Sequence, residues 1–424
     1  MEQSILYAAS WMLSPHAPPV AGGALLVRNG LIVAVGTLDE LKRSHSAPVV
    51  DYPGCAIIPG FVNAHTHLEL THFPSWKIRN NMNYHPRRFV DWIIQLIKVK
   101  RGVAAEDYSH SVNEGIRMCL EVGTTAIGEI VTETGLVSLY GSSNLSGRLY
   151  PELLGHDPVR FTPLLEHAMK IGDTDGPGSF LTGVSPHSVY TLGEENMAAI
   201  RDVAVGKGMP LTIHVAESAA ETDFVFDSSG PIAGELYPYV GWEQYLLPPR
   251  HATAVGVLDR AGLLTASSLA VHCVHVTRAD AEILRQRDVG IVLCPRSNER
   301  LDVGRAPVAL FRKLGIPLAL GTDSLASNDS LSLWDEMRFA LDAFPGELSP
   351  ADLFRMVTAN AAATIGIAPS HGSLEPGKRA DFQIVENIGV ATTTPRVLEQ
   401  VITGGVTRET YVAGERYAAW PGDL

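Results

Sequence analysis

Two histidines separated by one residue, His65 and His67, are the first side chains of the sequence that could bind a metal ion together. In an extended chain, residues i and i+2 point to the same side, so both imidazoles can face one ligand. The pair alone is weak evidence, because a chain with 15 histidines contains such pairs by chance. It favours a metal site only if other donor residues are brought beside it.

Three more groups of donor side chains follow short apolar segments later in the chain. They are His214-Val-Ala-Glu217, His272-Cys-Val-His275 and Gly321-Thr-Asp323. Each has an ordinary alternative: His214 as a hydrogen-bonded core histidine, Glu217 as a solvated acid, and Asp323 as a helix cap. Together, three imidazoles and a carboxylate form a donor set suited to Zn²⁺, Fe²⁺ or Mn²⁺. The combination predicts a divalent metal site if the preceding segments are strands of one sheet.

The segments before these groups alternate with segments of helical periodicity. Apolar residues over 89–97 recur at the spacing of one helix face, and further helices are predicted over 197–203, 281–286 and 333–341. Ser349-Pro-Ala-Asp352 is a capping box that starts another helix. Strands are predicted over 56–58, 125–127, 147–150, 181–184, 211–215, 269–271, 289–293 and 317–320. This α/β alternation predicts a (β/α)8 TIM barrel over residues 59–371, with its chemistry at the carboxyl ends of the strands.

Both ends of the chain are predicted to be β-structure. Apolar runs at 24–27 and 31–35 are joined by Arg28-Asn29-Gly30, which contains a strong hairpin signal. Near the C-terminus, residues 381–385, 401–402 and 410–412 are strand-like. We therefore expect residues 1–58 and 372–424 to form one small composite domain, a β-sandwich built from both termini.

The composition narrows the classes of function. Hydrophobic residues make up 46% and charged residues 19%, which is typical of a globular protein with a large core. The net charge of −13 gives no electrostatic basis for binding nucleic acid or an anionic membrane. No apolar run approaches the ~18 residues of a membrane span, and the stretch 5–13 lacks the basic flank of a signal peptide. Four widely spaced cysteines argue against a disulfide framework, so a cytoplasmic location is expected. Whether the chain forms a homo-oligomer is left open by the sequence.

These motifs resemble those of the amidohydrolase superfamily. The similarity is closest to its cytosine, guanine and S-adenosylhomocysteine deaminase and triazine hydrolase branch, and it spans nearly the whole chain. The matching segments are Pro59-Gly-Phe-Val-Asn-Ala-His65-Thr-His67, His214-x-x-Glu217, His272, Gly321-Thr-Asp323, Ser185-Pro-His187, Ser297-Asn298, Ala326-Ser-Asn328, Thr358-Ala-Asn-Ala-Ala and Glu375-Pro-Gly-Lys-Arg-Ala-Asp381. The resemblance implies the same barrel and the same composite β domain.

The resemblance also implies the metal ligands. The predicted fourth strand, over 180–189, contains neither the Lys nor the Glu that bridges two metals in other members of the superfamily. His214-x-x-Glu217 is instead the pattern of the one-metal deaminases. By this resemblance, one divalent ion, Zn²⁺ with Fe²⁺ or Mn²⁺ as alternatives, is bound by His65, His67, His214 and Asp323.

Catalytic roles follow from the same resemblance. The metal lowers the pKa of its bound water towards ~7, which supplies hydroxide at neutral pH. Asp323 would accept the proton of this water, and Glu217 would protonate the ring nitrogen beside the attacked carbon and later the leaving amine. His272 would hydrogen-bond the attacking water, with ligation of a second metal as the alternative. His275 is expected to be structural.

Substrate contacts are predicted at five positions. Glu69 and Trp76 follow the metal pair, and His187 occupies a position that commonly contacts substrate in the family, with a core histidine as the alternative. Arg296 and Arg300 depart from the apolar or small residues of adenosine-type deaminases in this segment. They predict a carboxylate or phosphate on the substrate, with ordinary surface charge as the alternative.

The expected substrate is a small aminated heterocycle or nucleoside. His-Thr-His-Leu-Glu69 with Ser-Asn-Glu-Arg-Leu301 most resembles the aminodeoxyfutalosine deaminases of the alternative menaquinone route, whose substrate carries both an adenine ring and a benzoate. S-adenosylhomocysteine or adenosine deamination is the next alternative, followed by guanine or pterin deamination. A cyclic amidohydrolase, a triazine-type chlorohydrolase and an inactive metal-binding relative also remain. The zinc deaminases with H-x-E and P-C-x-x-C are excluded, because the chain has no C-x-x-C.

Overall fold

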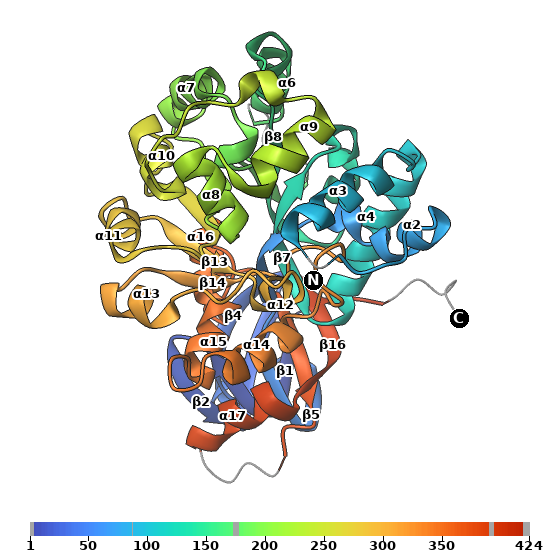
Figure 1. Cartoon of the computed structure of the whole chain (residues 1–424). Helices are drawn as coiled ribbons and strands as arrows, with labels where there is room; N and C mark the ends of the chain where they lie inside the picture. Colours follow the sequence, from blue (N-terminus) through green and yellow to red (C-terminus); the bar gives the residue numbers. More distant parts are fainter. Residues whose placement is uncertain (1–3, 87, 173–177, 390–393, 419–424) are drawn as a thin grey trace.

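The computed structural model describes residues 4–86, 88–172, 178–389 and 394–418 (Figure 1). Parallel strands and helices make up the middle of the chain, and strands from both ends form a separate sheet at the bottom of the view. Among the described residues, no helix combines the length and the apolar character that a bilayer crossing requires. All four cysteines are buried and none is in a disulfide.

The terminal sheet contains eight strands in the order β17-β16-β15-β5-β1-β3-β4, with β2 paired to β1. Their bounds are β1 Ser4–Ser14, β2 Ala17–Ala21, β3 Gly23–Arg28, β4 Leu31–Thr37, β5 Val49–Pro59, β15 Phe382–Glu386, β16 Val406–Val412 and β17 Glu415–Arg416. The predicted hairpin is confirmed: β3 and β4 are antiparallel, and Asn29 and Gly30 have φ values of 51° and 75°. Hydrogen bonding joins these strands into one sheet, so the expected sandwich of two facing sheets stays a prediction.

Two predicted strands need correction: the first is a strand of another sheet, and the second is helical. Residues 56–58 belong to β5 of the terminal sheet, and the strand that leads to His65 is β6, Phe61–Thr66. Both segments are buried on both faces, so hydrophobicity alone could not distinguish them. Residues 401–402 lie in α17, Thr394–Gly404, because Val397, Leu398, Val401 and Ile402 repeat at helical rather than strand spacing.

Parallel strands form two sheets in the middle of the chain. One contains β6, β7 Thr124–Val131, β8 Ser146–Leu153, β9 Phe180–Thr182 and β10 Ser185–Pro186. The other contains β11 Leu211–Val215, β12 Ser268–His272, β13 Gly290–Leu293 and β14 Leu318–Leu320. Isolated parallel bridges connect Val184 with Leu211 and Thr66 with Asp323, so the two sheets meet at both edges.

Helices follow most of these strands and cover them. The predicted helices are confirmed as α3 Phe89–Lys100, α7 Glu194–Val203, α11 Arg278–Gln286, α14 Leu333–Ala343 and α15 Pro350–Met356. Ser349 accepts a hydrogen bond from the Asp352 backbone, as its capping box requires. The other helices are α1 Leu38–Ser44, α2 Phe73–Arg79, α4 Ala105–Glu121, α5 Val137–Gly141, α6 Pro158–Gly172, α8 Ala219–Asp227, α9 Tyr237–Val240, α10 Ala254–Ala261, α12 Pro295–Arg300, α13 Val308–Leu314 and α16 Ala359–Thr364.

Every position of β6, β7, β11, β12, β13 and β14 is buried. Parallel strands covered on both faces are continuously apolar, so a polar side chain at such a strand end stands out. The fold therefore brings the carboxyl ends of these strands, and the polar residues on them, to one side of the molecule.

Candidate active site

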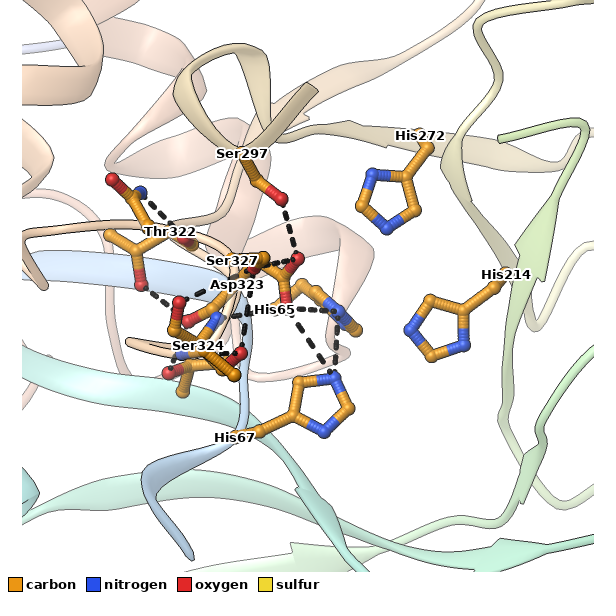
Figure 2. Close-up of polar contacts among 12 residues, drawn as sticks. His65, His67, His214, His272, Ser297, Thr322, Asp323, Ser324 and Ser327 are labelled. Atoms are coloured by element: carbon orange, nitrogen blue, oxygen red, sulfur yellow. Dashed lines mark hydrogen bonds and ion pairs between the residues drawn. The ribbon is translucent and has the colours of Figure 1, made fainter. Parts of the chain in front are cut away.

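Four histidines and one aspartate meet at the carboxyl ends of β6, β11, β12 and β14 (Figure 2). His65 Nε2 lies 3.2 Å from His67 Nε2, and these atoms lie 3.9 and 3.7 Å from Asp323 Oδ1. Possible ligand atoms of His65, His67 and Asp323 lie within 4.8 Å of one another, and so do those of His65, His214 and His272. The groups singled out in the sequence are therefore brought together around one centre.

The backbone at two of these positions has an uncommon conformation. His272 has a φ of 70° and Asp323 a φ of 57°, in the left-handed region that residues with a Cβ atom rarely adopt. Asp323 is fixed there because its backbone N–H donates to His65 O at 3.1 Å and its carbonyl accepts from Thr66 Oγ1 at 3.1 Å. Such conformations cluster at functional sites, where the surrounding structure holds them in place.

The carboxylate of Asp323 is held by three donors. Ser297 Oγ and Ser327 Oγ donate to Oδ2 at 2.7 and 2.6 Å, and the Ser324 backbone N–H donates to Oδ1 at 2.8 Å. Burial raises the pKa of Asp323, but the neighbouring histidines and the Ser327 hydroxyl lower it further, so the net pKa lies below the ordinary value. Asp323 is therefore an anion whose Oδ1 faces the histidines.

Hydrogen bonds orient two of the imidazoles. His214 Nδ1 lies 3.0 Å from the carbonyl oxygen of His187, and His272 Nδ1 lies 2.9 Å from Asn298 Oδ1. Since both partners are acceptors, each Nδ1 carries the proton and each Nε2 keeps its lone pair. A second partner of this kind is typical of histidines that bind metals.

The donor set fits a divalent metal ion. Burial lowers the pKa of His65, His214 and His272, which keeps them in the neutral form that binds metals. Two imidazole nitrogens 3.2 Å apart beside a carboxylate present lone pairs to one point, and His65 Nδ1 has no hydrogen-bond partner among the described residues. Neutral imidazoles with one carboxylate match Zn²⁺ and the similar ions Fe²⁺ and Mn²⁺.

Glu217 lies beside this centre rather than inside the cluster. Its Oε1 is 3.6 Å from His272 Nε2, and the side chain is almost fully buried. Burial and then the charge of Asp323 raise the pKa of Glu217 well above the ordinary value. A raised pKa favours the protonated form of this carboxyl group, from which it can donate a proton to a bound molecule.

A cavity of about 280 Å³ opens above the cluster. His67, His214, His272, Glu217 and Asp323 line one end of it. Most of the remaining wall is apolar and comes from α3 and from the segment around α9: Phe89, Trp92, Ile93, Leu96, Ile97, Leu236, Val240 and Trp242. The cavity therefore suits a molecule with a polar reacting end and a largely apolar body.

Of the five residues predicted to contact substrate, only His187 lines this cavity. Its Nε2 lies 4.0 Å from Glu152 Oε1. Glu69 is buried, and it accepts hydrogen bonds from the backbone of Thr132 and Glu133 at 3.2 and 2.9 Å, so it supports a loop instead. Trp76 is buried against Tyr108 with ring centroids 5.2 Å apart.

Arg296 and Arg300 also lie outside the cavity lining. The guanidinium of Arg296 pairs with Asp329 and lies 3.7 Å from Asp335, while Arg300 lies 3.6 Å from Asp329. Both charges are thus directed at surface acids on neighbouring segments. The carboxylate clamp predicted from this arginine pair is not supported by their positions.

Two charged residues of the cavity lining were not identified from the sequence. Glu152 is the next-to-last residue of β8 and lies beside His187, and Lys100 is the last residue of α3. The ending Pro151-Glu152 of a buried strand could have identified the first, by the argument used for the other strand ends. His275, in contrast, behaves as expected, since its Nε2 donates to the carbonyl of Val303 at 2.8 Å.

Comparisons with known proteins agree with this geometry. Residues 56–408 match the model of the amidohydrolase family, and residues 23–45 match that of a bacterial imidazolonepropionase-like composite domain. An aminodeoxyfutalosine deaminase of Deinococcus radiodurans is 31% identical over 81% of each chain. A 5-methylthioadenosine/S-adenosylhomocysteine deaminase of Nitratidesulfovibrio vulgaris is 30% identical, over 79% of this chain and 71% of the relative.

Solved structures with the same fold include an adenosine deaminase from Xanthomonas campestris with bound Zn. It has a TM-score of 0.82 and 26% identity, over 98% of this chain and 92% of that one. An aminofutalosine deaminase of Helicobacter pylori also has a TM-score of 0.82, with 19% identity over 98% and 100% of the two chains. At that identity the second likeness concerns the fold alone.

Proposed function

Because this chain belongs to the amidohydrolase family and is a hydrolase of carbon–nitrogen bonds in cyclic amidines, we propose that it hydrolytically deaminates an adenine-type nucleoside. One observation carries the proposal: three imidazoles and an ionised Asp323 converge at one end of a mostly apolar cavity, with the buried carboxyl group of Glu217, whose pKa is raised, beside them. This set provides a metal site, a base and an acid around one point.

His65, His67, His214 and Asp323 would hold one divalent ion, Zn²⁺ being the first candidate. When bound, such an ion supplies a Lewis acid that makes water nucleophilic near neutral pH. Oδ1 of Asp323 then accepts the proton that the attacking water loses. Oδ2 is occupied by the hydroxyls of Ser297 and Ser327, which leaves Oδ1 directed at the reacting centre.

Glu217 acts on the substrate side of the reaction. Its proton passes to the ring nitrogen next to the attacked carbon, which makes that carbon more electrophilic. The proton that Asp323 took from water then passes to the amino group, which leaves as ammonia, and the proton of the added hydroxyl returns to Glu217 as the carbonyl forms. His272, held by Asn298, accepts a hydrogen bond from the attacking water at Nε2. A second metal with His272 as ligand is the alternative, since its nitrogen lies near those of His65 and His214.

As the substrate we favour 6-amino-6-deoxyfutalosine, which would yield futalosine for menaquinone biosynthesis. The similarity to the Deinococcus aminodeoxyfutalosine deaminase supports it, as does the apolar wall that the cavity has in addition to its reacting end. S-adenosylhomocysteine and 5′-methylthioadenosine are the second candidates, because relatives named for them are almost equally similar.

We extend the proposal to the architecture. Residues 59–371 would form a closed (β/α)8 barrel, supported by the parallel bridges at both edges of the two sheets. Residues 1–58 and 372–424 would form the composite β-sandwich, supported by the pairing of β15 with β5.

A panel assay tests the function. Metal-loaded enzyme is incubated with 6-amino-6-deoxyfutalosine, S-adenosylhomocysteine, 5′-methylthioadenosine, adenosine and guanine, and ammonia release is measured. We expect kcat/KM to be highest for 6-amino-6-deoxyfutalosine, and a His214→Ala control to be inactive. Release of ammonia from guanine alone, or from none of the compounds, would contradict the proposal.

A further inference from the structure

Lys100 is the one Lys or Arg among the described residues that line the active-site cavity. It is the last residue of α3, whose residues Trp92, Leu96 and Lys100 follow one another at intervals of four on the same face of the helix. The apolar residues of this face form a wall of the cavity, and the ammonium group ends the row. A cation is thus placed at the edge of an apolar surface that faces the reacting centre.

No carboxylate among the described residues forms an ion pair with Lys100. Its Nζ lies 5.9 Å from the centroid of the Tyr108 ring, a contact that leaves the ammonium donors available. Two buried or partly buried carboxylates near the cavity, Glu69 and Glu152, have other partners. Glu69 accepts the backbone N–H groups of Thr132 and Glu133, and Glu152 accepts the hydroxyl of Thr132 at 3.1 Å.

The charge of Lys100 nevertheless reaches the site. It helps to lower the pKa of His67 and of His187, for which burial is the main cause, and it opposes the rise that burial imposes on Glu69. Lys100 lines the same cavity as His67 and His187, so its charge acts across the space that a bound molecule would occupy. A partly buried cation without an anionic partner is costly unless water or a ligand compensates it.

We propose that Lys100 binds a carboxylate on the substrate, at the end of the molecule away from the amino group that is removed. The inference rests on the proposed function, and it names the substrate class as adenine nucleosides that carry a carboxylate beyond an apolar spacer. Trp92, Leu96 and Ile97 would contact the spacer. Arg296 and Arg300 cannot take this role, because their guanidinium groups pair with Asp329 outside the cavity.

The test compares two substrates that differ only in charge: 6-amino-6-deoxyfutalosine and the methyl ester of its benzoate. Metal-loaded wild-type enzyme and the Lys100→Met variant are assayed on both, and on adenosine. A charge-assisted hydrogen bond contributes about tenfold to over a hundredfold in kcat/KM. We expect Lys100→Met to lose that factor on the acid, mainly through KM, and to change by less than about twofold on the ester and on adenosine.

Two further variants make the result specific. Lys98→Met removes a lysine from an exposed position of the same helix, where its ammonium lies over the Tyr239 ring, and it should leave all three substrates unaffected. Lys100→Arg keeps the charge and should recover most of the activity on the acid.

Equal losses of Lys100→Met on acid and ester, or no loss on either, would overturn the role of Lys100 while the deaminase function stands. If wild-type enzyme released ammonia from no nucleoside at all, the proposed function would fail, and this inference with it.

Discussion

Asn298 Oδ1 lies 2.9 Å from His272 Nδ1, and this contact turns the other ring nitrogen of His272 towards Glu217. Asn298 therefore orients the imidazole ring of His272. We expect Asn298→Ala to lower kcat by about 10- to 100-fold, the usual effect of removing such a partner, with little change in KM. Asn298→Asp keeps an acceptor oxygen and should recover part of the loss. An Asn298→Asp variant no better than Asn298→Ala would argue against positioning by this hydrogen bond.

The proton on Glu217 can be tested by a change that keeps its shape. Glu217→Gln should lose roughly 10²- to 10⁴-fold in kcat, the scale of general acid–base catalysis, while metal content measured by elemental analysis stays at the wild-type level. Glu221→Gln is a neighbouring control, since Glu221 accepts the backbone N–H of Glu217 at 2.8 Å without lining the cavity. Loss of metal from Glu217→Gln would make Glu217 a ligand instead.

Metal content tests the ligand set directly. We expect about one divalent ion for each active chain, and we expect a chelator to remove both the ion and the activity. His65→Ala should bind metal far more weakly than wild type, as measured by competition with a chromophoric chelator. His275→Ala should bind it normally, because the imidazole of His275 donates to the carbonyl of Val303. Two ions for each active chain would move His272 into the ligand set.

Stability should depend on pH through Glu336, which is buried in α14. Burial raises its pKa to about 8, and its oxygens accept hydrogen bonds from Asn328 and from the Arg296 backbone. Between its ordinary value of 4.5 and about 8 the unfolded chain releases this proton while the folded one keeps it. Stability therefore falls across this window as pH rises, by up to about 1.4 kcal/mol for each pH unit.

Glu336→Gln should remove that contribution, so its melting temperature should fall less than that of wild type between pH 5 and pH 9. Asp342→Asn changes an exposed acid on the same helix and should retain the wild-type fall. The same fall in both variants would show that Glu336 is not the titrating group.

Local signals made much of the fold predictable. The Asn29-Gly30 turn and the capping box at Ser349 depend on a few neighbouring residues, and both are present in the structure. Residues 56–58 and 401–402 were misassigned because a short apolar run has no period of its own. Which sheet a buried strand joins is decided by contacts with segments far away in the chain.

In the active site, too, local signals were predictable and contacts between distant segments were not. His65, His67, His214, His272 and Asp323 could be found because each follows a strand, and parallel strands bring their ends together. Lys100 was not found, because its place in the cavity depends on how α3 packs across the strand ends rather than on any motif around it. The motif around Arg296 likewise could not show the ion pair that this residue forms, because its partner Asp329 comes from another segment.

The pairing of β5 with β15 has a consequence for how the protein is made. Gln383 in β15 reaches the carbonyl of Pro59 in β5, 324 residues earlier in the chain. Because a chain is synthesised at about 5–20 residues per second, β5 stays without its partner strand for roughly 15–65 s. An exposed strand edge can pair with another chain in the meantime. Chains that end before Phe382 keep this edge permanently, so truncated products of this protein should aggregate rather than accumulate as folded fragments.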